Sequence, residues 1–356
     1  MEKLTGIIRA ALLVALTLAA SAVGLTGTAL LTRDEAPPSL PITASISGSG
    51  SSAQKGAMDA WRADFQGLHP DLRVDYNANG SGAGIRDFIT GATAFAGSDV
   101  AMHPDEQLRA DRRCHSRAIH LPMVVGPIAL AYNLPSTPEL KLSPTTLTGI
   151  FSGRITRWDA AQIAADNRGA NLPGTGIRLF HRSDDSGTTY NFTAYLKEAG
   201  RWPYEPSRKF ADTGQGVTGS AGITEAIGRT EGSIGYVEYA YAGDAALRTA
   251  KIRNAAGQFV ALSPQSATKA LEGARIAGHN GDLIVTFDYL TKNKDAYPII
   301  LVTYEIICSR SSDPLVRTFL DYTASDAGQS YLSLYGYAPL PHDLLAKVRT
   351  QLGVTT

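Results

Sequence analysis

The sequence predicts an α/β fold from three observations. Strand-like and helix-like segments alternate, the loops between them are short and rich in Gly and Ser, and one long apolar run is broken in its middle. Residues 42–50 ("ITASISGSG") have the character of a strand that ends in a turn. Residues 52–70 then place apolar side chains at helical spacing and close with Gly67 and Pro70. The same order repeats through residues 72–99, and this βαβα rhythm predicts a parallel sheet covered by helices.

The broken apolar run, residues 119–134 ("IHLPMVVGPIALAYNL"), predicts a crossing between two lobes. Gly126 and Pro127 interrupt it, and the later strand in residues 296–309 ("AYPIILVTYEIICS") resembles it. At 356 residues, of which 44% are hydrophobic, the chain is long enough for one large or two ordinary domains. Residues 330–352 end in an amphipathic pattern that predicts a C-terminal helix.

The N-terminus differs from the rest of the chain. Lys3 and Arg9 precede an uncharged stretch, and residues 1–32 therefore have the layout of an export signal, with the Ala-Ser-Ala of residues 20–22 as a cleavage site. The stretch is also about long enough to span a bilayer, so an uncleaved membrane anchor is the alternative. Either way we expect the body to face outward, after a polar, Pro-rich linker at residues 33–42. We expect no lipid anchor, because the leader is not followed closely by a cysteine.

Charge and cysteine content narrow the class of protein further. The 33 basic and 33 acidic residues balance, whereas a nucleic-acid-binding protein usually has a basic excess. Any bound anion must therefore be held by a local site.

Cys114 and Cys308 are the only cysteines in the sequence, and in an exported chain such a pair predicts a disulfide, with two buried thiols as the alternative. Their spacing does not suit a zinc site.

Three Gly/Ser-rich turns follow strand-like segments in the first half of the chain. In an α/β sheet the carboxyl ends of the strands are where ligands bind, and helix N-termini there offer free N–H groups. One such turn is weak evidence, but three at comparable places indicate a ligand site. They are Gly48-Ser49-Gly50-Ser51-Ser52, Gly80-Ser81-Gly82-Ala83-Gly84 and Gly97-Ser98-Asp99.

The stretch "FHRSDDSGTTYNF", residues 180–192, is a fourth such turn and the most informative. Arg182 supplies a cationic fork suited to an oxyanion, and Asp184 is placed to orient it. The turn itself is rich in hydrogen-bond donors and stands before a helix-like segment: Ser186, Gly187 and Thr188.

Two other interpretations of this turn remain open from the pattern alone. Asp185 or Ser186 could simply cap the helix, with Arg182 and Asp184 as a surface ion pair. The second interpretation is a catalytic turn with Ser186 as the nucleophile. The residues around Ser186 do not form the Gly-x-Ser-x-Gly pattern, however, and His181 would point away from Arg182 on the strand. The phosphate loop of nucleotide hydrolases is excluded because no Gly-Lys-Ser/Thr follows the glycines.

Asp99 is unexpected in a site built for anions. An ionised carboxylate repels an anion unless the ligand brings a proton, as hydrogen phosphate does and sulfate at neutral pH does not. An aspartate that must accept a proton would therefore reject sulfate. A capping or strand-end aspartate is the alternative.

Taken together, these segments resemble the periplasmic phosphate-binding proteins of phosphate-specific ABC importers. The resemblance runs from about residue 44 to about residue 348 and rests on the combination of its motifs. These include "SGSGSSAQKGAMDAWRADF", "VDYNANGSGAGIRDFITGATAFAGSD", "LPMVVGPIALAYNLP", "IFSGRITRWD", "HRSDDSGTTYNFTAYL", "GSIGYVEYAYA" and "YPIILVTYEIIC".

The resemblance implies a role for each matching position. Asp99 would be the proton-accepting carboxylate, Arg182 the cationic clamp and Asp184 its orienting partner. The resemblance also supports the Cys114–Cys308 disulfide. The phosphate contacts it implies are Ser51, Ser52, the backbone of Ala53, Ser81, Asp99, Arg182, Ser186, Gly187 and Thr188.

The resemblance also implies a two-lobed periplasmic-binding-protein fold, type II-like, with a ligand cleft between lobes joined by two hinge crossings. Lobe one would comprise residues 43–126 and 300–356, and lobe two residues 127–299. Such a chain would bind inorganic phosphate outside the membrane as a monomer and deliver it to the permease subunits of an ABC importer, with no catalysis, cofactor, metal or nucleic acid. A membrane-tethered phosphate sensor or scavenger that serves no permease is the alternative.

Two departures from the family pattern stand out. The family often has an aromatic residue where this chain has Ala53, which should change packing and lobe closure but not a backbone contact. Many members also carry a lipidation cysteine after the leader, which bears on anchoring and not on the ligand.

Overall fold

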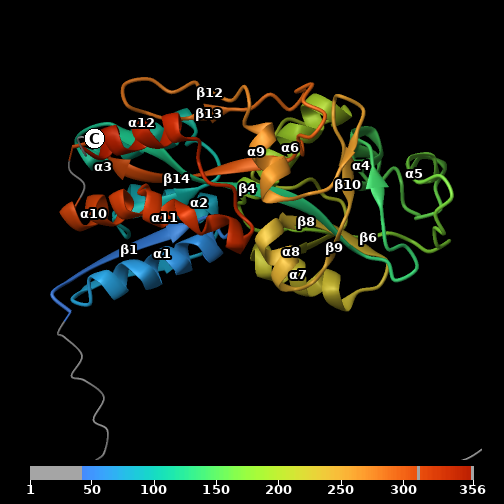
Figure 1. Cartoon of the computed structure of the whole chain (residues 1–356), viewed down its shortest axis with the longest axis horizontal. Coiled ribbons are helices and arrows are strands. Elements are labelled where there is room, and N and C mark those ends of the chain that lie inside the picture. The colour runs from blue at the N-terminus through green and yellow to red at the C-terminus, as the bar shows by residue number, and fades with distance from the viewer. Residues whose placement is uncertain (1–41, 311–312, 354–356) are drawn as a thin grey trace, which may run out of the picture. The chain divides into compact units, whose positions relative to one another are not determined.

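The computed structural model describes residues 42–310 and 313–353 (Figure 1). The predicted leader at residues 1–32 and nearly all of the linker at 33–42 lie outside the described residues. Within the described ranges, no helix has the length and apolar character needed to cross a membrane.

One sheet runs through the described part of the chain, with its strands in the order β2-β1-β3-β14-β4-β8-β6-β7 and β9 paired to β4. Two smaller sheets, β11-β10-β5 and β12-β13, lie outside it. The strands of the main sheet are β1 (Ala44–Gly50), β2 (Leu72–Asn77), β3 (Phe95–Ser98), β4 (Ala118–Asn133), β6 (Arg178–Arg182), β7 (Gln215–Val217), β8 (Ser233–Glu238), β9 (Arg248–Thr249) and β14 (Ile300–Cys308). The others are β5 (Lys141–Leu142), β10 (Lys251–Arg253), β11 (Phe259–Val260), β12 (Arg275–Ile276) and β13 (Val285–Thr286).

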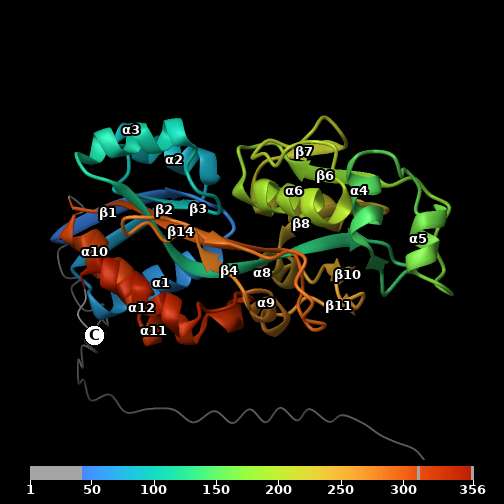
Figure 2. The ribbon, with the colours of Figure 1, turned by 90° about the horizontal axis from the view of Figure 1, so that it is seen from above.

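Helices cover both faces of the sheet. Figure 2 shows α2 and α3 on one side of β1, β2 and β3, with α1, α10, α11 and α12 on the other. The helices are α1 (Lys55–Leu68), α2 (Ser81–Thr90), α3 (Pro104–Cys114), α4 (Pro144–Phe151), α5 (Ala161–Asp166), α6 (Gly187–Gly200), α7 (Gly219–Arg229), α8 (Tyr239–Asp244), α9 (Pro264–Ala270), α10 (Pro314–Thr323), α11 (Asp326–Ser330), the 3-10 helix η1 (Leu332–Tyr335) and α12 (His342–Leu352). The α/β class, the first βαβα units and the C-terminal helix are as the sequence predicts.

The expectation of a parallel sheet is only partly right. β1 pairs in parallel with β2 and β3, and β6 pairs in parallel with β7 and β8. Between these two groups, β4 and β14 run antiparallel to each other and to their other neighbours in the main sheet. The reason is that β4 and β14 carry the chain across the sheet and back, so they must run in opposite directions.

The 16-residue strand β4 links two apolar cores. Its first half pairs with β14 and its second half with β8. Val125 packs in the first core, with Trp61 and Phe319, while Ile128 packs in the second core, with Phe192. Figure 1 shows β4 running from one group of elements to the other. The fold is thus α/β and two-lobed, and the lobe boundaries at 126/127 and 299/300 remain predictions.

The predicted disulfide is present. Cys114, at the end of α3, and Cys308, at the end of β14, are joined with Cα atoms 5.3 Å apart. Both belong to a small buried cluster with Ile85 and Phe88 of α2. Since 194 residues separate the two cysteines, the bridge ties an early segment of the chain to a late one.

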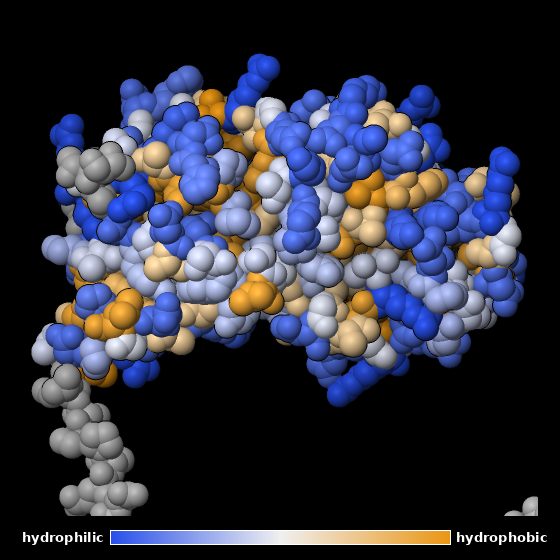
Figure 3. Space-filling model, in the orientation of Figure 1, coloured by the Kyte–Doolittle hydropathy of each residue, from blue (hydrophilic) through white to orange (hydrophobic). Residues whose placement is uncertain are grey.

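Side chains on the face in Figure 3 are mostly hydrophilic, and the hydrophobic ones form small, separated patches. The most exposed large hydrophobic residue of the described part, Leu334, is 84% exposed and belongs to η1. Scattered exposure of this kind is normal for a globular protein and does not indicate a docking surface by itself.

Candidate anion site

All nine predicted contact residues are buried, and hydrogen bonds link most of them into two sets, one around Asp99 and one around Arg182. None of the eight that carry a side chain exposes more than 4% of its surface. Gly187 is also buried. The three early turns follow β1, β2 and β3, and the fourth follows β6. Because these are the carboxyl ends of parallel strands, the polar side chains meet where the sheet topology predicts a ligand.

Asp99 lies at the centre of the half contributed by the first three turns. Its Oδ1 accepts hydrogen bonds from Ser51 Oγ (2.5 Å) and Thr303 Oγ1 (2.7 Å), and its Oδ2 accepts one from Ser81 Oγ (3.1 Å). In the described part of the chain, every side chain that donates to this carboxylate is therefore a neutral hydroxyl. Burial raises the pKa of Asp99 to about 6, and these three hydrogen bonds oppose that rise.

Arg182 lies at the centre of the other half and forms the expected ion pair with Asp184. Its Nε donates to Asp184 Oδ1 at 2.7 Å, and its Nη2 contacts Oδ2. Asp184 also accepts from the backbone N–H of Gly219, at the start of α7. Burial alone would raise the pKa of Asp184, but the hydrogen bonds and charge of Arg182 outweigh it and lower that pKa. The pair is buried, so the surface-pair interpretation of the sequence is wrong.

The remaining guanidinium nitrogen, Arg182 Nη1, points to hydroxyls. It donates to Ser220 Oγ at 3.1 Å and makes a long contact of 3.5 Å with Thr188 Oγ1. Ser220 Oγ also lies 2.9 Å from Ser52 Oγ. The chain Ser52–Ser220–Arg182 therefore joins the first turn to the fourth.

Ser186 has the capping role that the sequence left open, and its predicted contact with an anion stays compatible with it. It is the N-cap of α6, where its Oγ accepts from the N–H of Thr189 at 3.2 Å. Because the hydroxyl only accepts in that bond, its own hydrogen remains available to a ligand. Capping the helix and contacting an anion at its N-terminus are therefore compatible.

Gly187 allows the two halves to approach closely. A Cβ at this position would lie 2.5 Å from Ser81 Oγ and 2.7 Å from Asp99 Cβ, so any side chain would collide with the opposite half. Asn191 of α6 adds a direct link across the same boundary, since its Nδ2 donates to the backbone carbonyl of Asp99 at 2.7 Å.

Ala53 is placed differently from the other residues. Its backbone N–H, expected to contact the ligand, here donates to Ser51 Oγ at 3.0 Å. Its side chain packs in the second apolar core, and its carbonyl accepts from Tyr337 Oη at 2.8 Å. A ligand contact at this N–H therefore requires the Ser51 hydroxyl to rotate away.

His181 is turned away from the group, as its position on the strand predicts. Its ring stacks on Phe210, with centroids 4.8 Å apart, and its Nδ1 contacts the carbonyl of Arg182. His181 is therefore not placed to act as a base for Ser186. Within residues 42–310 and 313–353, no cluster of His, Cys, Asp and Glu could hold a metal ion.

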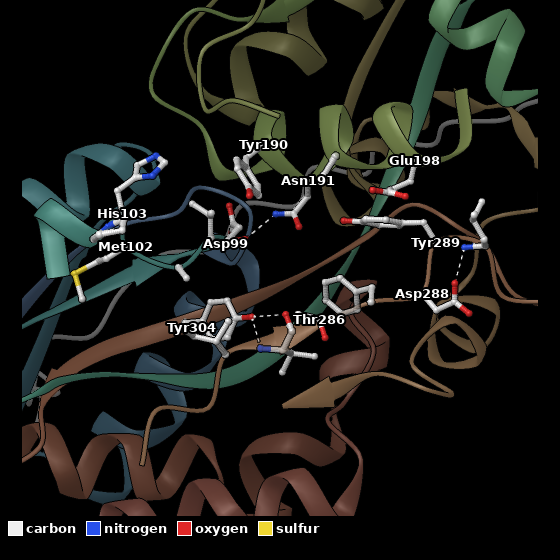
Figure 4. A pocket seen from close by; sticks show the side chains of 18 residues that line it. Asp99, Met102, His103, Tyr190, Asn191, Glu198, Thr286, Asp288, Tyr289 and Tyr304 are labelled. Carbon is white, nitrogen blue, oxygen red and sulfur yellow. Dashed lines mark hydrogen bonds between the residues drawn. The ribbon is translucent and has the colours of Figure 1, made fainter. Parts of the chain in front are cut away.

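A groove of about 480 Å³ reaches Asp99 (Figure 4). Its lining includes aromatic rings from both halves, among them Tyr190, Tyr289 and Tyr304, but none of the other eight predicted contacts. Figure 4 shows the amide of Asn191 pointing to Asp99, and both residues line the groove. The groove therefore meets the buried residues at Asp99 alone among the nine predicted contacts.

Sequence reasoning missed three participants: Thr303, Glu238 and Ser220. Thr303 donates to Asp99, and Glu238 accepts from Thr188 Oγ1. Thr303 lies within the mostly apolar strand β14, and Glu238 lies at the end of the mostly apolar strand β8. A polar residue in such a strand was the sequence signal that could have identified both as site residues. Ser220, in the first turn of α7, carries no comparable signal because its surroundings in sequence are ordinary for a helix start.

Comparison with known proteins is consistent with this arrangement. The family model for the PBP superfamily domain matches residues 35–327. The phosphate-binding protein PstS3 of Mycobacterium bovis is 42% identical over 315 residues, which cover 86% of this chain and 85% of that protein. The PstS protein of Pasteurella multocida is 30% identical over 326 residues, with 86% and 89% covered.

Solved structures share the fold at lower identity. The ancestral soluble variant of the human phosphate-binding protein superimposes with a TM-score of 0.68 at 20% identity, covering 86% of this chain and 93% of that one. A phosphate-binding protein from Stenotrophomonas maltophilia gives a TM-score of 0.63 at 19% identity, with the same coverage. Given the family model and the sequence relatives, the chain belongs to the PBP superfamily and, within it, to the PstS family of phosphate-binding proteins.

Proposed function

We propose that this protein binds inorganic phosphate outside the membrane and delivers it to the permease subunits of an ABC-type importer. The proposed contacts are the nine residues of the buried group, with Asp184 orienting Arg182. The membership of the PstS family and the donor-rich character of the group both support this ligand. Export also agrees with the disulfide, since disulfides persist in oxidising compartments.

The donors in the buried group suit a tetrahedral oxyanion. Five hydroxyls, the N-terminus of the 14-residue helix α6 and the Arg182 fork converge, and together they offer many hydrogen bonds but a single positive charge. Such a site favours an anion whose oxygens can each be satisfied by neutral donors.

One observation carries the choice of phosphate over sulfate: a buried carboxylate, Asp99, is surrounded only by hydroxyl donors. With a pKa of about 6, this group is mostly ionised at neutral pH. It can then accept a hydrogen bond from the P–OH group of hydrogen phosphate, whereas a sulfate oxygen has no proton to donate and would face the carboxylate as an unpaired like charge. Rejection should be strong because the mismatched charges are buried.

The proposed mechanism involves binding and closure, not chemistry. With the predicted division into a first lobe (residues 43–126 and 300–356) and a second lobe (residues 127–299), the Asp99 half and the Arg182 half would belong to different lobes. Phosphate entering between them would contact both and hold them together. We expect no hydrolysis of phosphate esters, because Ser186 lacks a base.

Calorimetric titration with phosphate and then sulfate tests this proposal. We expect the wild-type protein, freed of ligand by unfolding and refolding, to bind phosphate and to give no heat with sulfate. Asp99→Asn should lose at least about tenfold of the discrimination between the two anions, because an amide can donate to a sulfate oxygen. The matched control is Asp159→Asn, at an exposed aspartate, which should leave both titrations unchanged.

Two results would contradict the proposal. Absence of phosphate binding by the refolded wild-type protein, checked for native circular dichroism, would exclude the ligand. Tight sulfate binding by the wild-type protein would exclude the role given to Asp99.

A further inference from the structure

Glu238 is a buried carboxyl group beside the anion site that the proposed contacts leave unexplained. It ends β8, and none of its surface is exposed. Its Oε1 accepts a hydrogen bond from Thr188 Oγ1, and its Oε2 has no hydrogen-bond partner in the part of the chain that the structure describes. A buried carboxyl oxygen without a partner is costly, which indicates that something beyond stability keeps this residue in place.

The hydroxyl of Thr188 has a fixed capacity of one donated and two accepted hydrogen bonds. Three neighbours compete for it: Glu238 Oε1, Arg182 Nη1 at 3.5 Å, and the proposed phosphate. Arg182 can only donate. If Glu238 is ionised it can only accept, so the Thr188 hydrogen points to Glu238 and an oxygen lone pair faces the anion.

A proton on Glu238 reverses this arrangement. The acid then donates to Thr188 Oγ1, both lone pairs of Thr188 are occupied by Glu238 and Arg182, and its hydrogen is free to point to the anion. All three neighbours are satisfied in this state. Only the protonated form of Glu238 therefore lets Thr188 donate to a bound anion.

The charges around the site favour the same state. Arg182 already neutralises Asp184, and Asp99 is a second buried carboxylate. Adding a phosphate dianion while Glu238 is ionised would leave several buried negative charges without a matching cation. The charged and titratable groups that interact with Glu238 are Arg182 on β6, Asp99 after β3, Tyr241 on α8 and Tyr337 after η1.

We propose that Glu238 is a positioning residue that holds a proton in the phosphate complex and thereby turns the hydroxyl of Thr188 toward the anion. The inference rests on the proposed function and deepens it. It gives the site a second carboxyl group, which acts through Thr188, whereas Asp99 would accept a hydrogen bond from the ligand itself. Phosphate binding should then be accompanied by proton uptake at Glu238 in the pH range where the free protein has lost that proton.

The number of protons taken up on binding is the measurement that tests this inference. Phosphate is titrated into the protein by calorimetry between pH 5 and 9, at each pH in two buffers of different ionisation enthalpy. The test variant is Glu238→Gln, whose amide donates to Thr188 at every pH and so mimics the protonated acid. Comparing the two proteins at equal pH cancels the protons contributed by phosphate, and repeating the comparison on an Asp99→Asn background removes the contribution of Asp99, whose pKa the charge of Glu238 helps to raise.

We expect the wild-type protein to take up about one proton more per phosphate than Glu238→Gln somewhere in this range. The variant should retain its phosphate affinity within about threefold near pH 5 and lose less affinity than wild type as the pH rises. On a Thr188→Val background, where there is no hydroxyl to orient, Glu238→Gln should have a smaller effect on affinity, because only the effect of its charge remains. This double-mutant comparison separates positioning of Thr188 from a merely structural role.

Equal proton uptake by the wild-type protein and Glu238→Gln at every pH would overturn the inference. So would an effect of Glu238→Gln that persists unchanged on the Thr188→Val background. Neither result touches the proposed function, because both require that the wild-type protein bind phosphate. A wild-type protein that binds no phosphate would instead exclude the proposed function, and the inference with it.

Discussion

Two aspartates of the anion site, Asp99 and Asp184, have opposite surroundings. Asp99 is hydrogen-bonded by hydroxyls alone, and burial raises its pKa to about 6. Asp184 is held by both nitrogens of the Arg182 fork, which lower its pKa in spite of burial. The same side chain is thus costly to ionise in one half of the site and easy to ionise in the other.

The difference shows how one site can attract an anion and also select it. On the Arg182 half, the aspartate fixes the guanidinium and cancels most of its charge, so the anion meets an oriented donor. On the Asp99 half, the carboxylate has only hydroxyl partners in the described part of the chain, so it should accept a ligand that carries a P–OH donor and repel one that does not. We therefore expect affinity to depend mainly on the first half and discrimination on the second.

Removal of the positive charge of Arg182 should have the largest effect on phosphate affinity. Arg182→Met leaves the phosphate without a charge partner and Asp184 buried and unpaired, so phosphate affinity should fall by at least about 1,000-fold, or about 4 kcal/mol. Calorimetry measures the affinity, and circular dichroism checks the fold. The matched control is Arg157→Met, in an Arg-x-Asp pair of the same spacing that is 57% and 42% exposed, which should change affinity less than about twofold. Retention of affinity within tenfold by Arg182→Met would contradict the division of roles.

Replacement of Asp99, whose carboxylate is hydrogen-bonded by hydroxyls and not by a cation, should stabilise the ligand-free protein at neutral pH. A rise from 3.8 to about 6 means that between these values the folded state holds a proton that the unfolded state has lost. Stability therefore falls as the pH rises through this window, and above it Asp99 costs up to about 3 kcal/mol. Asp99→Asn should therefore raise the free energy of unfolding by part of this amount at pH 8 and by much less at pH 4.

Urea unfolding of phosphate-free protein at pH 4 and pH 8 measures this effect. Glu305, whose pKa burial raises to about 8, also contributes to the pH dependence, and because the charge of Asp99 adds to that rise, Asp99→Asn should lower the pKa of Glu305 as well. Asp159→Asn, at the exposed site, serves as the control. A loss of stability in Asp99→Asn at pH 8 would show that the hydroxyl contacts outweigh the cost of the buried charge.

Local features of the sequence were sufficient to predict the α/β class, the first βαβα units and the four turns. Each depends on patterns within about 20 residues, such as the apolar spacing of α1 or the glycines after β1. Strand direction in the middle of the sheet was not predictable in this way. β4 and β14 pair antiparallel although 166 residues separate Asn133 from Ile300, and only the return path of the chain fixes that direction.

The polar residues that complete the site were hidden for a related reason. Thr303 and Glu238 stand in apolar strands, where an isolated polar side chain looks like an interruption until its partners on other strands are known. Asp184 was predictable because its partner Arg182 is two residues away. The partners of Glu238 and Thr303, Thr188 and Asp99, are 50 and 204 residues away.

The smallest effect is expected at a contact that joins the two halves outside the ligand contacts. Arg208 donates to Glu106 of α3 at 2.6 Å and contacts Asp185 at 3.0 Å, and the three side chains are only 10%, 9% and 18% exposed. Arg208→Ala should weaken the joined arrangement by about 1.4 kcal/mol, which is about tenfold in phosphate affinity. The loss of affinity should appear as a faster dissociation rate, measured by stopped-flow, because Arg208 helps to hold the halves together but is not one of the ligand contacts.

Lys197→Ala is the control, since Lys197 pairs with the exposed Glu205 on the same half. A slower association rate with unchanged dissociation would instead place Arg208 on the route by which phosphate enters.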